Sequence, residues 1–103
     1  MNENELAKNF QQALLEAYKT AKNEYKYNAT YFLRMINEHG GIATAKILIN
    51  KKEPTDGFTK LWELGQLKLT VEAHALRPEY QKLFTPEELD KARQRLREYQ
   101  YSC

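Results

Sequence analysis

Cysteine is almost absent from this sequence. The single cysteine is Cys103, the last of 103 residues, so no internal disulfide can form. Disulfides persist mainly in oxidising compartments, and a chain without them fits a reducing, cytoplasmic setting. We expect Cys103 to be an unpaired thiol, with an intermolecular disulfide as the alternative.

Serine is equally scarce, and Ser102 is its only example. A nucleophilic hydrolase needs a Ser, Cys or Thr held beside a base in a rigid site. Ser102 and Cys103 both lie at a terminus, where chains fray. Helix caps and helix surfaces explain Thr30, Thr44 and Thr70 more simply. The sequence therefore offers no good catalytic nucleophile, and we expect no enzyme.

Histidine is limited to His39 and His74, which are far apart in the sequence. Metal sites usually draw their ligands from closer spacings, such as H-E-x-x-H. A site built from both histidines with Glu63 or Glu72 is an open alternative, but we expect no metal and no cofactor. The glycines at 40–41 lack the pattern of a phosphate-binding loop and fit the end of a helix better.

Long hydrophobic runs are missing too. The uncharged apolar runs are far shorter than the about 20 residues that span a bilayer, and Met1 is not followed by a basic segment. We therefore expect neither export nor membrane association. The formal net charge is only +2, so the total does not indicate a nucleic-acid partner, although a balanced total can hide an uneven distribution.

The composition is that of a globular protein. Hydrophobic residues make up 42% and charged residues 29%, which is outside the range of disordered chains. A chain of 103 residues is long enough to bury one core without metals or disulfides. No internal repeat is present. We expect a single domain that covers residues 1–103.

The strongest periodic pattern predicts a long first helix from about residue 4 to 25. Apolar residues recur there at steps of three and four, as one stripe of an amphipathic helix. The stripe consists of Leu6, Phe10, Ala13, Leu14, Ala17 and Ala21. A second helix is expected from an Asn28 cap to about His39, and a third from about Ile42 to Asn50.

The stretch from Asp56 to Leu76 holds the only tryptophan and several dense apolar positions. After a loop at 51–55, Thr55 or Asp56 can cap a short helix that stops at Gly65. Thr70 can cap another short helix over residues 71–76. We expect this stretch to be scaffold, with its apolar residues packed against the second helix. The residues of this stretch that should pack are Phe58, Leu61, Trp62, Leu69 and Val71. The surface of the second helix that should receive them is formed by Phe32, Met35 and Ile36.

The clearest local signal precedes the last helix. Thr85 fits the N-cap, Pro86 the first helical position, and Glu88 closes a capping box. The helix should run to about Tyr99 and bury Leu89, Ala92, Leu96 and Tyr99. These elements predict an all-α domain of five or six helices, with long N-terminal and C-terminal helices around short central ones.

One charge distribution on the first helix suggests a binding surface. At about 100° per residue, four lysines cluster opposite the apolar stripe, with one leucine among them and a tyrosine at their flank. These residues are Lys8, Lys19, Lys22, Lys26, Leu15 and Tyr18. A solvated helix face is the alternative, and Leu15 on a polar face could also mark a homodimer contact.

A second basic pair lies on the last helix. Arg93 and Arg97 are one turn apart, and arginine suits bidentate contact with phosphate or carboxylate. An internal salt bridge, for example to Asp90, is the favoured alternative.

Five segments resemble a group of small bacterial proteins of about 100 residues. They read YNATYFLRMINEHGG, ATAKILI, DGFTKLWELGQLKLTVEA, RPEYQKLFTPEEL and ARQRLREYQY, and together they cover nearly the whole chain. The resemblance implies a bacterial or phage setting, near mobile-element or defence genes. That group has no assigned activity, so no catalytic residue is carried over.

These observations favour a non-enzymatic interaction protein that binds another macromolecule, as a regulator, inhibitor or accessory factor. A protein partner is the leading expectation. Nucleic-acid binding through the lysines of the first helix and the Arg93/Arg97 pair is the alternative.

Overall fold

The computed structural model describes residues 2–99, which form six α-helices and two short 3₁₀ turns, with no strand among them. Ser102 and Cys103 lie outside the described residues. The all-α prediction is confirmed. The elements are α1 (Glu3–Tyr25), α2 (Thr30–His39), α3 (Gly41–Ile49), α4 (Asp56–Glu63), η1 (Leu67–Leu69), α5 (Val71–Ala75), η2 (Gln81–Leu83) and α6 (Pro86–Glu98).

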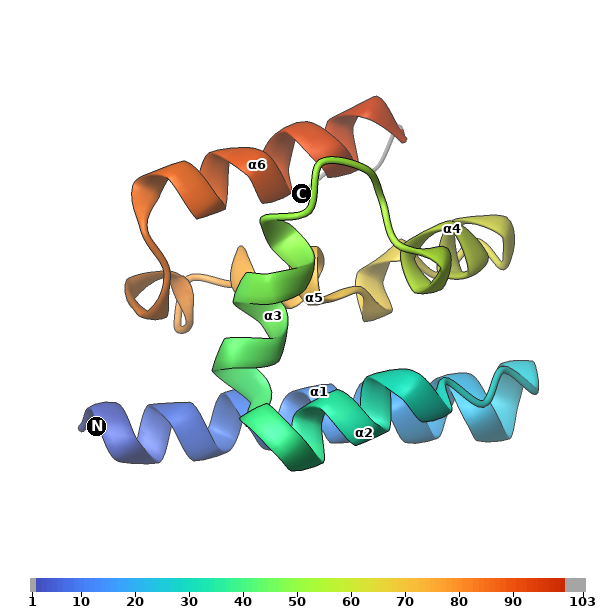
Figure 1. Cartoon of the computed structure of the whole chain (residues 1–103), viewed down its shortest axis with the longest axis horizontal. Coiled ribbons are helices and arrows are strands. Elements are labelled where there is room, and N and C mark those ends of the chain that lie inside the picture. Colours follow the sequence, from blue (N-terminus) through green and yellow to red (C-terminus); the bar gives the residue numbers. More distant parts are fainter. Residues whose placement is uncertain (1, 100–103) are drawn as a thin grey trace.

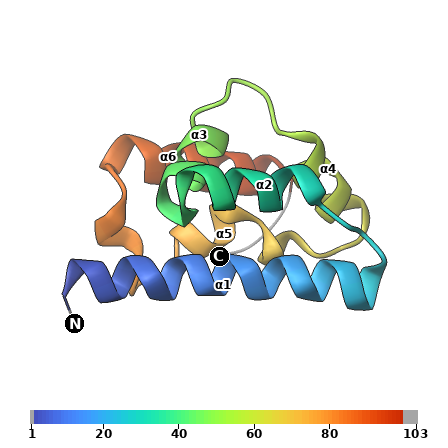
Figure 2. The same ribbon diagram turned by 60° about the horizontal axis from the view of Figure 1, so that its bottom comes forward.

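The helices form two outer layers joined by α3. Helices α1 and α2 lie on one side of the molecule, α6 lies on the other, and α3 crosses between them (Figure 1). Helix α5 is enclosed between α1, α3 and α6. At about 1.5 Å per residue, α1 runs along nearly the whole longest dimension of 35 Å, beside α2 in Figure 2. None of the helices in residues 2–99 has the length and apolar character needed to cross a membrane.

The predicted stripe of α1 supplies much of the main core. Leu6, Phe10, Leu14, Ala17 and Ala21 are all buried, as the periodicity indicated. The Phe10 ring meets two aromatic rings from the segment before α6 edge-to-face, with centroid distances of 5.1 Å to Tyr80 and 5.4 Å to Phe84. Edge-to-face pairs of this kind stabilise a core beyond their buried area. This cluster holds α1 against the C-terminal half of the chain.

The glycine pair forms the joint between α2 and α3. Gly40 has φ of 86°, which favours glycine, and it ends α2 as expected. Gly41 begins α3 and donates its N–H to Oε1 of Gln11 at 2.8 Å. A Cβ at Gly41 would lie 2.8 Å from Cα of Gln11, so only glycine allows this close approach of α3 to α1.

Three of the predicted helix caps are confirmed. The side-chain oxygens of Thr55, Thr70 and Thr85 accept hydrogen bonds from backbone N–H groups at the starts of α4, α5 and α6. The capping box of Thr85 and Glu88 is complete in both directions. Such caps contribute about 1 kcal/mol each. Gly65, with φ of 71°, follows α4 as the predicted stop.

Two predictions about single residues near helix ends are wrong. Asn28 does not cap α2, which begins at Thr30 without a side-chain cap; the Asn28 side chain instead accepts the Tyr18 hydroxyl at 2.6 Å. Thr44 does not lie on a helix surface, because α3 crosses the interior and buries it completely.

The prediction that Trp62 belongs to the core is also wrong. Its side chain is 47% exposed and rests edge-to-face on Tyr99. Helix α4 buries Phe58 instead, in a small second cluster with Leu67 and Leu96. The main cluster consists of buried residues such as Leu6, Phe10, Leu14, Ile36, Ile49 and Val71. Val71 therefore shares a cluster with Ile36 as expected, whereas Phe58 belongs to the other cluster. Residues from both expected surfaces line a cleft between α2 and α4.

Candidate functional site

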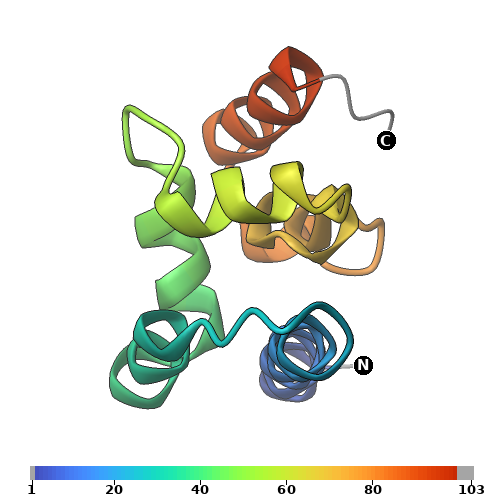
Figure 3. The same cartoon turned by 90° about the vertical axis from the view of Figure 1, so that its right-hand side faces the viewer.

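A cleft of about 540 Å³ opens between α2 and α4. Figure 3 views the end of the molecule where these two helices and the end of α1 come together. Parts of α1, the 26–29 connection, α2, α3, the 51–55 loop, α4, η1 and α5 line it. We call it the α2–α4 cleft. A volume of this size lies in the range of clefts that bind small ligands.

Small residues on α1 create part of the space. Ala17 and Ala21 lie on the buried stripe of α1 and line the cleft, where larger side chains would fill it. Met35 of α2, Phe58 of α4 and Val71 of α5 are buried and also line it. The cleft therefore has an apolar interior that is contributed by four helices.

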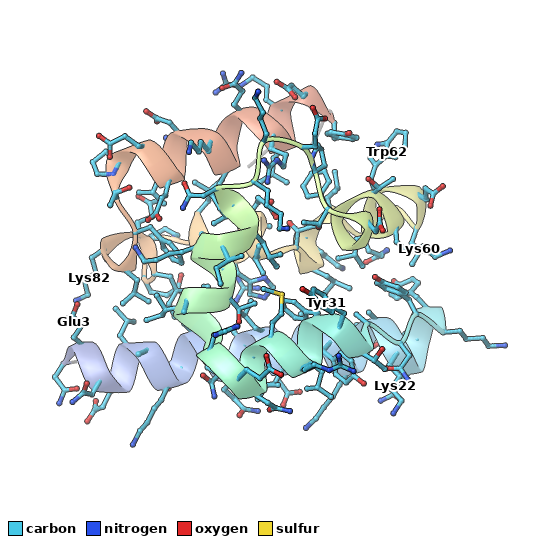
Figure 4. The ribbon with its side chains drawn as sticks, viewed as in Figure 1. Glu3, Lys22, Tyr31, Lys60, Trp62 and Lys82 are labelled. Carbon is cyan, nitrogen blue, oxygen red and sulfur yellow. The ribbon has the colours of Figure 1, made fainter. Side chains whose placement is uncertain are left out.

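Aromatic side chains are concentrated in the lining. Tyr18, Tyr27, Tyr31, Phe32 and Phe58 all contribute to it. Tyr31 is 68% exposed, the largest value among the exposed large hydrophobic side chains of residues 2–99. In Figure 4, Tyr31 lies between α2 and α4, whereas Trp62 points away from α2. Tyrosine is enriched in protein interfaces because it joins a large apolar ring to a hydroxyl.

A buried ion pair supports the inner wall of the cleft. Nη1 of Arg95 donates to Oε2 of Glu72 at 2.8 Å, and both side chains are buried. Arg95 also donates to the carbonyl oxygens of Leu48 at 3.1 Å and Lys51 at 2.5 Å. Burial raises the pKa of Glu72, against the lowering effect of the bond from Arg95. Arg95 thus connects α6 to α5, to the end of α3 and to the loop beside the cleft.

Three charged residues in the lining have no ion-pair partner among residues 2–99: Lys51, Glu53 and Asp56. All three are exposed. Burial raises the pKa of the Tyr27 phenol, and the negative charge of the Asp56 carboxylate raises it further. The phenol therefore stays protonated at neutral pH and can donate a hydrogen bond.

Only three of the four lysines predicted as a binding face lie on α1. Lys8, Lys19 and Lys22 are exposed on α1. Lys26 lies beyond the helix end in a left-handed conformation with φ of 58°, so it does not continue the helical spacing. Lys19 lies 3.8 Å from the Glu16 carboxylate, an exposed pair of little energetic weight.

Leu15 was predicted on the polar face, and the structure contradicts this. It is half-buried and packs against the main core cluster. It lies one turn after Gln11, on the same side of α1, and Gln11 meets Gly41 of α3. Leu15 therefore gives no support to a homodimer contact. Tyr18 is also half-buried, and it lines the α2–α4 cleft rather than flanking an exposed basic face.

The predicted arginine pair does not join the lysines. Arg93 donates to Asp90 at 2.9 Å, the internal salt bridge that the sequence favoured, and Arg97 is exposed. Both arginines are on α6, on the opposite side of the molecule from α1 (Figure 1). The two basic groups therefore do not form one surface.

The structure does not bring together the metal ligands considered from the sequence. Among residues 2–99, no group of three or more His, Cys, Asp or Glu side chains is placed to hold a metal ion. His39 is exposed, with Nε2 at 3.9 Å from the Glu38 carboxylate. His74 is buried, with Nδ1 at 2.8 Å from the Thr70 carbonyl oxygen, and burial lowers its pKa.

Sequence reasoning missed Arg95 and Glu72 as a buried pair. The helical spacing could have predicted the burial of Arg95, because it lies three residues after Ala92 and next to Leu96, on the buried side of α6. Glu72 is flanked by Val71 and Ala73 in a helix too short to show a periodic pattern. Its burial follows from α5 being enclosed by other helices.

Comparison of the chain with protein-family models, with curated proteins and with solved structures found no match.

Proposed function

We propose that this chain is a non-enzymatic interaction protein whose α2–α4 cleft receives an apolar segment of a partner protein. The proposal places it in the cytoplasm of a bacterial or phage-infected cell, as a regulator, inhibitor or accessory factor. The observation that carries it is the aromatic-lined cleft of about 540 Å³ with Tyr31 exposed at it.

The composition of the lining supports a protein partner. Tyrosine and methionine are over-represented in protein interfaces, and hot spots cluster where an anchor residue fills a pocket. Tyr31 supplies exposed ring area, while Met35 can adapt its shape to different anchors. The polar groups of the lining, such as the Tyr27 phenol, can hydrogen-bond to the backbone of an inserted segment.

Peptide selection followed by measured binding tests this proposal. The purified chain would select binders from a random phage-displayed peptide library, and the selected peptides would be titrated against Tyr31→Ala and Ile47→Ala. Ile47 is the matched control, because it is also exposed, at 42%, but does not line the cleft. We expect Tyr31→Ala to weaken binding about fivefold or more, the effect of losing about 1 kcal/mol, and Ile47→Ala to leave it unchanged.

Two results would reject the proposal: no enriched peptide, or peptides that bind wild type and Tyr31→Ala with the same affinity. The folded state of each variant would be checked by circular dichroism. Because Tyr31 is 68% exposed, its truncation should leave the fold intact.

Nucleic-acid binding is the second candidate, favoured by the exposure of Lys8, Lys19, Lys22 and Lys26. It would use a surface different from the cleft, since Lys22 points away from α4 in Figure 4. Binding would fall steeply with salt, because each neutralised phosphate releases counterions. A mobility-shift titration tests it, and no shift of DNA or RNA at about 50 mM salt would remove it.

A further inference from the structure

We infer that the segment received by the α2–α4 cleft carries a lysine or arginine beside its apolar anchor. This inference rests on the proposed function and specifies the partner's chemistry. It is carried by the charges and aromatic rings that the fold places around the cleft.

The uncompensated charge of the lining is negative. Glu53 and Asp56 contribute two carboxylates without ion-pair partners among residues 2–99, against the one ammonium of Lys51. The third carboxylate, Glu72, is balanced by Arg95 at 2.8 Å. A cation entering with an apolar anchor would therefore meet opposite charge, and an anion would meet like charge.

The aromatic rings favour the same ligand. A lysine or arginine head placed over a tyrosine face within about 6 Å is attracted by the ring's quadrupole. Tyr27 and Tyr31 lie in the lining together with Asp56. The Tyr27 hydroxyl lies beside Gly57, the residue that follows Asp56, since a Cβ at Gly57 would lie 3.5 Å from it. Burial, and after it the Asp56 carboxylate, raises the pKa of this phenol.

Lys22 and Lys60, two of the lysines labelled in Figure 4, do not reverse this balance. Lys22 points outward from the α1 and α2 side of the molecule, and Lys60 points outward from α4. Neither lines the cleft. A segment in the cleft therefore lies nearer to Glu53 and Asp56, which line it, than to these two lysines, and screening weakens charges more at longer range.

Three capped pentapeptides test the inference. They share a phenylalanine–leucine anchor and differ only in the next residue, which is lysine, norleucine or glutamate. Each would be titrated into the ¹⁵N-labelled chain at low salt, and binding would be followed by the amide shifts of cleft residues such as Tyr31 and Phe58. The same titrations would use Glu53→Gln/Asp56→Asn, Lys51→Gln and Glu79→Gln. Glu79→Gln is the matched charge control, because Glu79 is exposed and lies outside the cleft.

We expect the lysine peptide to bind about fivefold tighter than the glutamate peptide, with the norleucine peptide between them, the size of effect that one or two exposed ion pairs produce. The preference should disappear or reverse in Glu53→Gln/Asp56→Asn, where Lys51 is the remaining unpaired charge of the lining, increase in Lys51→Gln and stay unchanged in Glu79→Gln. Raising the salt concentration to about 0.5 M should also reduce it.

The outcomes separate this inference from the proposed function. Equal shifts of the cleft residues by all three peptides would overturn the charge preference but keep the cleft as an apolar docking site. Tighter binding of the glutamate peptide would overturn it as well. If no peptide shifts the cleft residues, both the inference and the proposed function fail.

Discussion

At Gly41, α3 packs closely against α1. A Cβ at this position would lie 2.8 Å from Cα and 2.9 Å from Cβ of Gln11, which are parts of α1 that cannot swing aside. We expect Gly41→Ala to lower the free energy of unfolding by about 1–3 kcal/mol, the usual cost of overpacking. Urea denaturation followed by circular dichroism measures this loss.

Gly57 provides the control for that substitution. It also lies in a helix, but a Cβ there would meet only the Tyr27 hydroxyl at 3.5 Å and the Thr55 hydroxyl at 3.8 Å, both ordinary contacts. Gly57→Ala should leave stability unchanged or raise it by up to about 1 kcal/mol, because alanine restricts the unfolded chain. Equal losses in the two variants would show that the contact with Gln11 is not the cause.

Trp62 and Phe58 should respond very differently to truncation. Phe58 is 3% exposed, so Phe58→Ala should cost about 3–5 kcal/mol. Trp62 is 47% exposed and chiefly loses its contact with Tyr99, so Trp62→Ala should cost only about 1–2 kcal/mol. Thermal and urea denaturation of both variants compares them. A larger loss for Trp62→Ala than for Phe58→Ala would contradict this placement of α4.

At the scale of the helices, one acidic side chain links α3 to α6. Glu88 accepts hydrogen bonds from the Lys46 ammonium at 2.8 Å, the Asn50 amide at 2.9 Å and the Thr85 N–H at 3.0 Å. Burial opposes ionisation of Glu88, but these bonds outweigh it and lower its pKa from 4.5 to about 2. The carboxylate therefore stays charged in mildly acidic solution.

This pKa makes the contribution of Glu88 depend on pH. Because the folded pKa lies below the unfolded one, the stabilisation is complete above about pH 5.5 and is lost as the pH falls through 4.5 towards 2. Glu88→Gln should cost about 2 kcal/mol at pH 7, from weakened charge-assisted bonds. The gap to wild type should close as the pH approaches 2.

Urea denaturation between pH 2 and pH 7 measures that gap. Glu87→Gln is the control, since Glu87 lies in the same turn of α6 and is exposed. It should change stability by only a few tenths of a kcal/mol, from the helix dipole alone. A gap for Glu88→Gln that is independent of pH would show that its charge is not what links the two helices.

The helices themselves were largely predictable because their signals are local. The caps at Thr55, Thr70 and Thr85 depend on residues at most three positions away, and the stripe of α1 is long enough to show its period. The orientation of α4 was not predictable. It has eight residues, and docking against η1 and α6 rather than α2 decides which face it buries.

The candidate site was less predictable than the fold for the same reason. The cleft combines segments between residues 17 and 72 that come together only in the folded chain. Tyr18 was singled out from the sequence, but as a neighbour of the lysines rather than as a cleft residue. The spacing of residues along one long helix shows which lysines share a face, so the sequence could reveal them. The aromatic residues of the cleft come from separate segments and follow no such spacing.

At the scale of the whole molecule, two core clusters share one residue. Leu76 packs against both the main cluster and the smaller one around Phe58. Helix α6 also contributes Ala92 to the first and Leu96 to the second. We therefore expect the described part of the chain to unfold as one cooperative unit.

Urea unfolding followed by two signals tests this expectation. Trp62 fluorescence reports on the smaller cluster through Tyr99, and far-ultraviolet circular dichroism reports on all helices. The two transitions should coincide, with a slope of about 1–3 kcal/mol per M urea. A fluorescence transition at a clearly lower urea concentration would show that α4 opens separately.

The α2–α4 cleft also has a consequence for the heat of binding. Its volume of about 540 Å³ has room for many water molecules, and much of its wall is apolar and offers them no hydrogen bond. Returning such water to bulk solvent gives a negative change in heat capacity, and often a favourable enthalpy near 25 °C. Calorimetry of an apolar anchor entering the cleft should therefore release more heat as the temperature rises, while the affinity changes little.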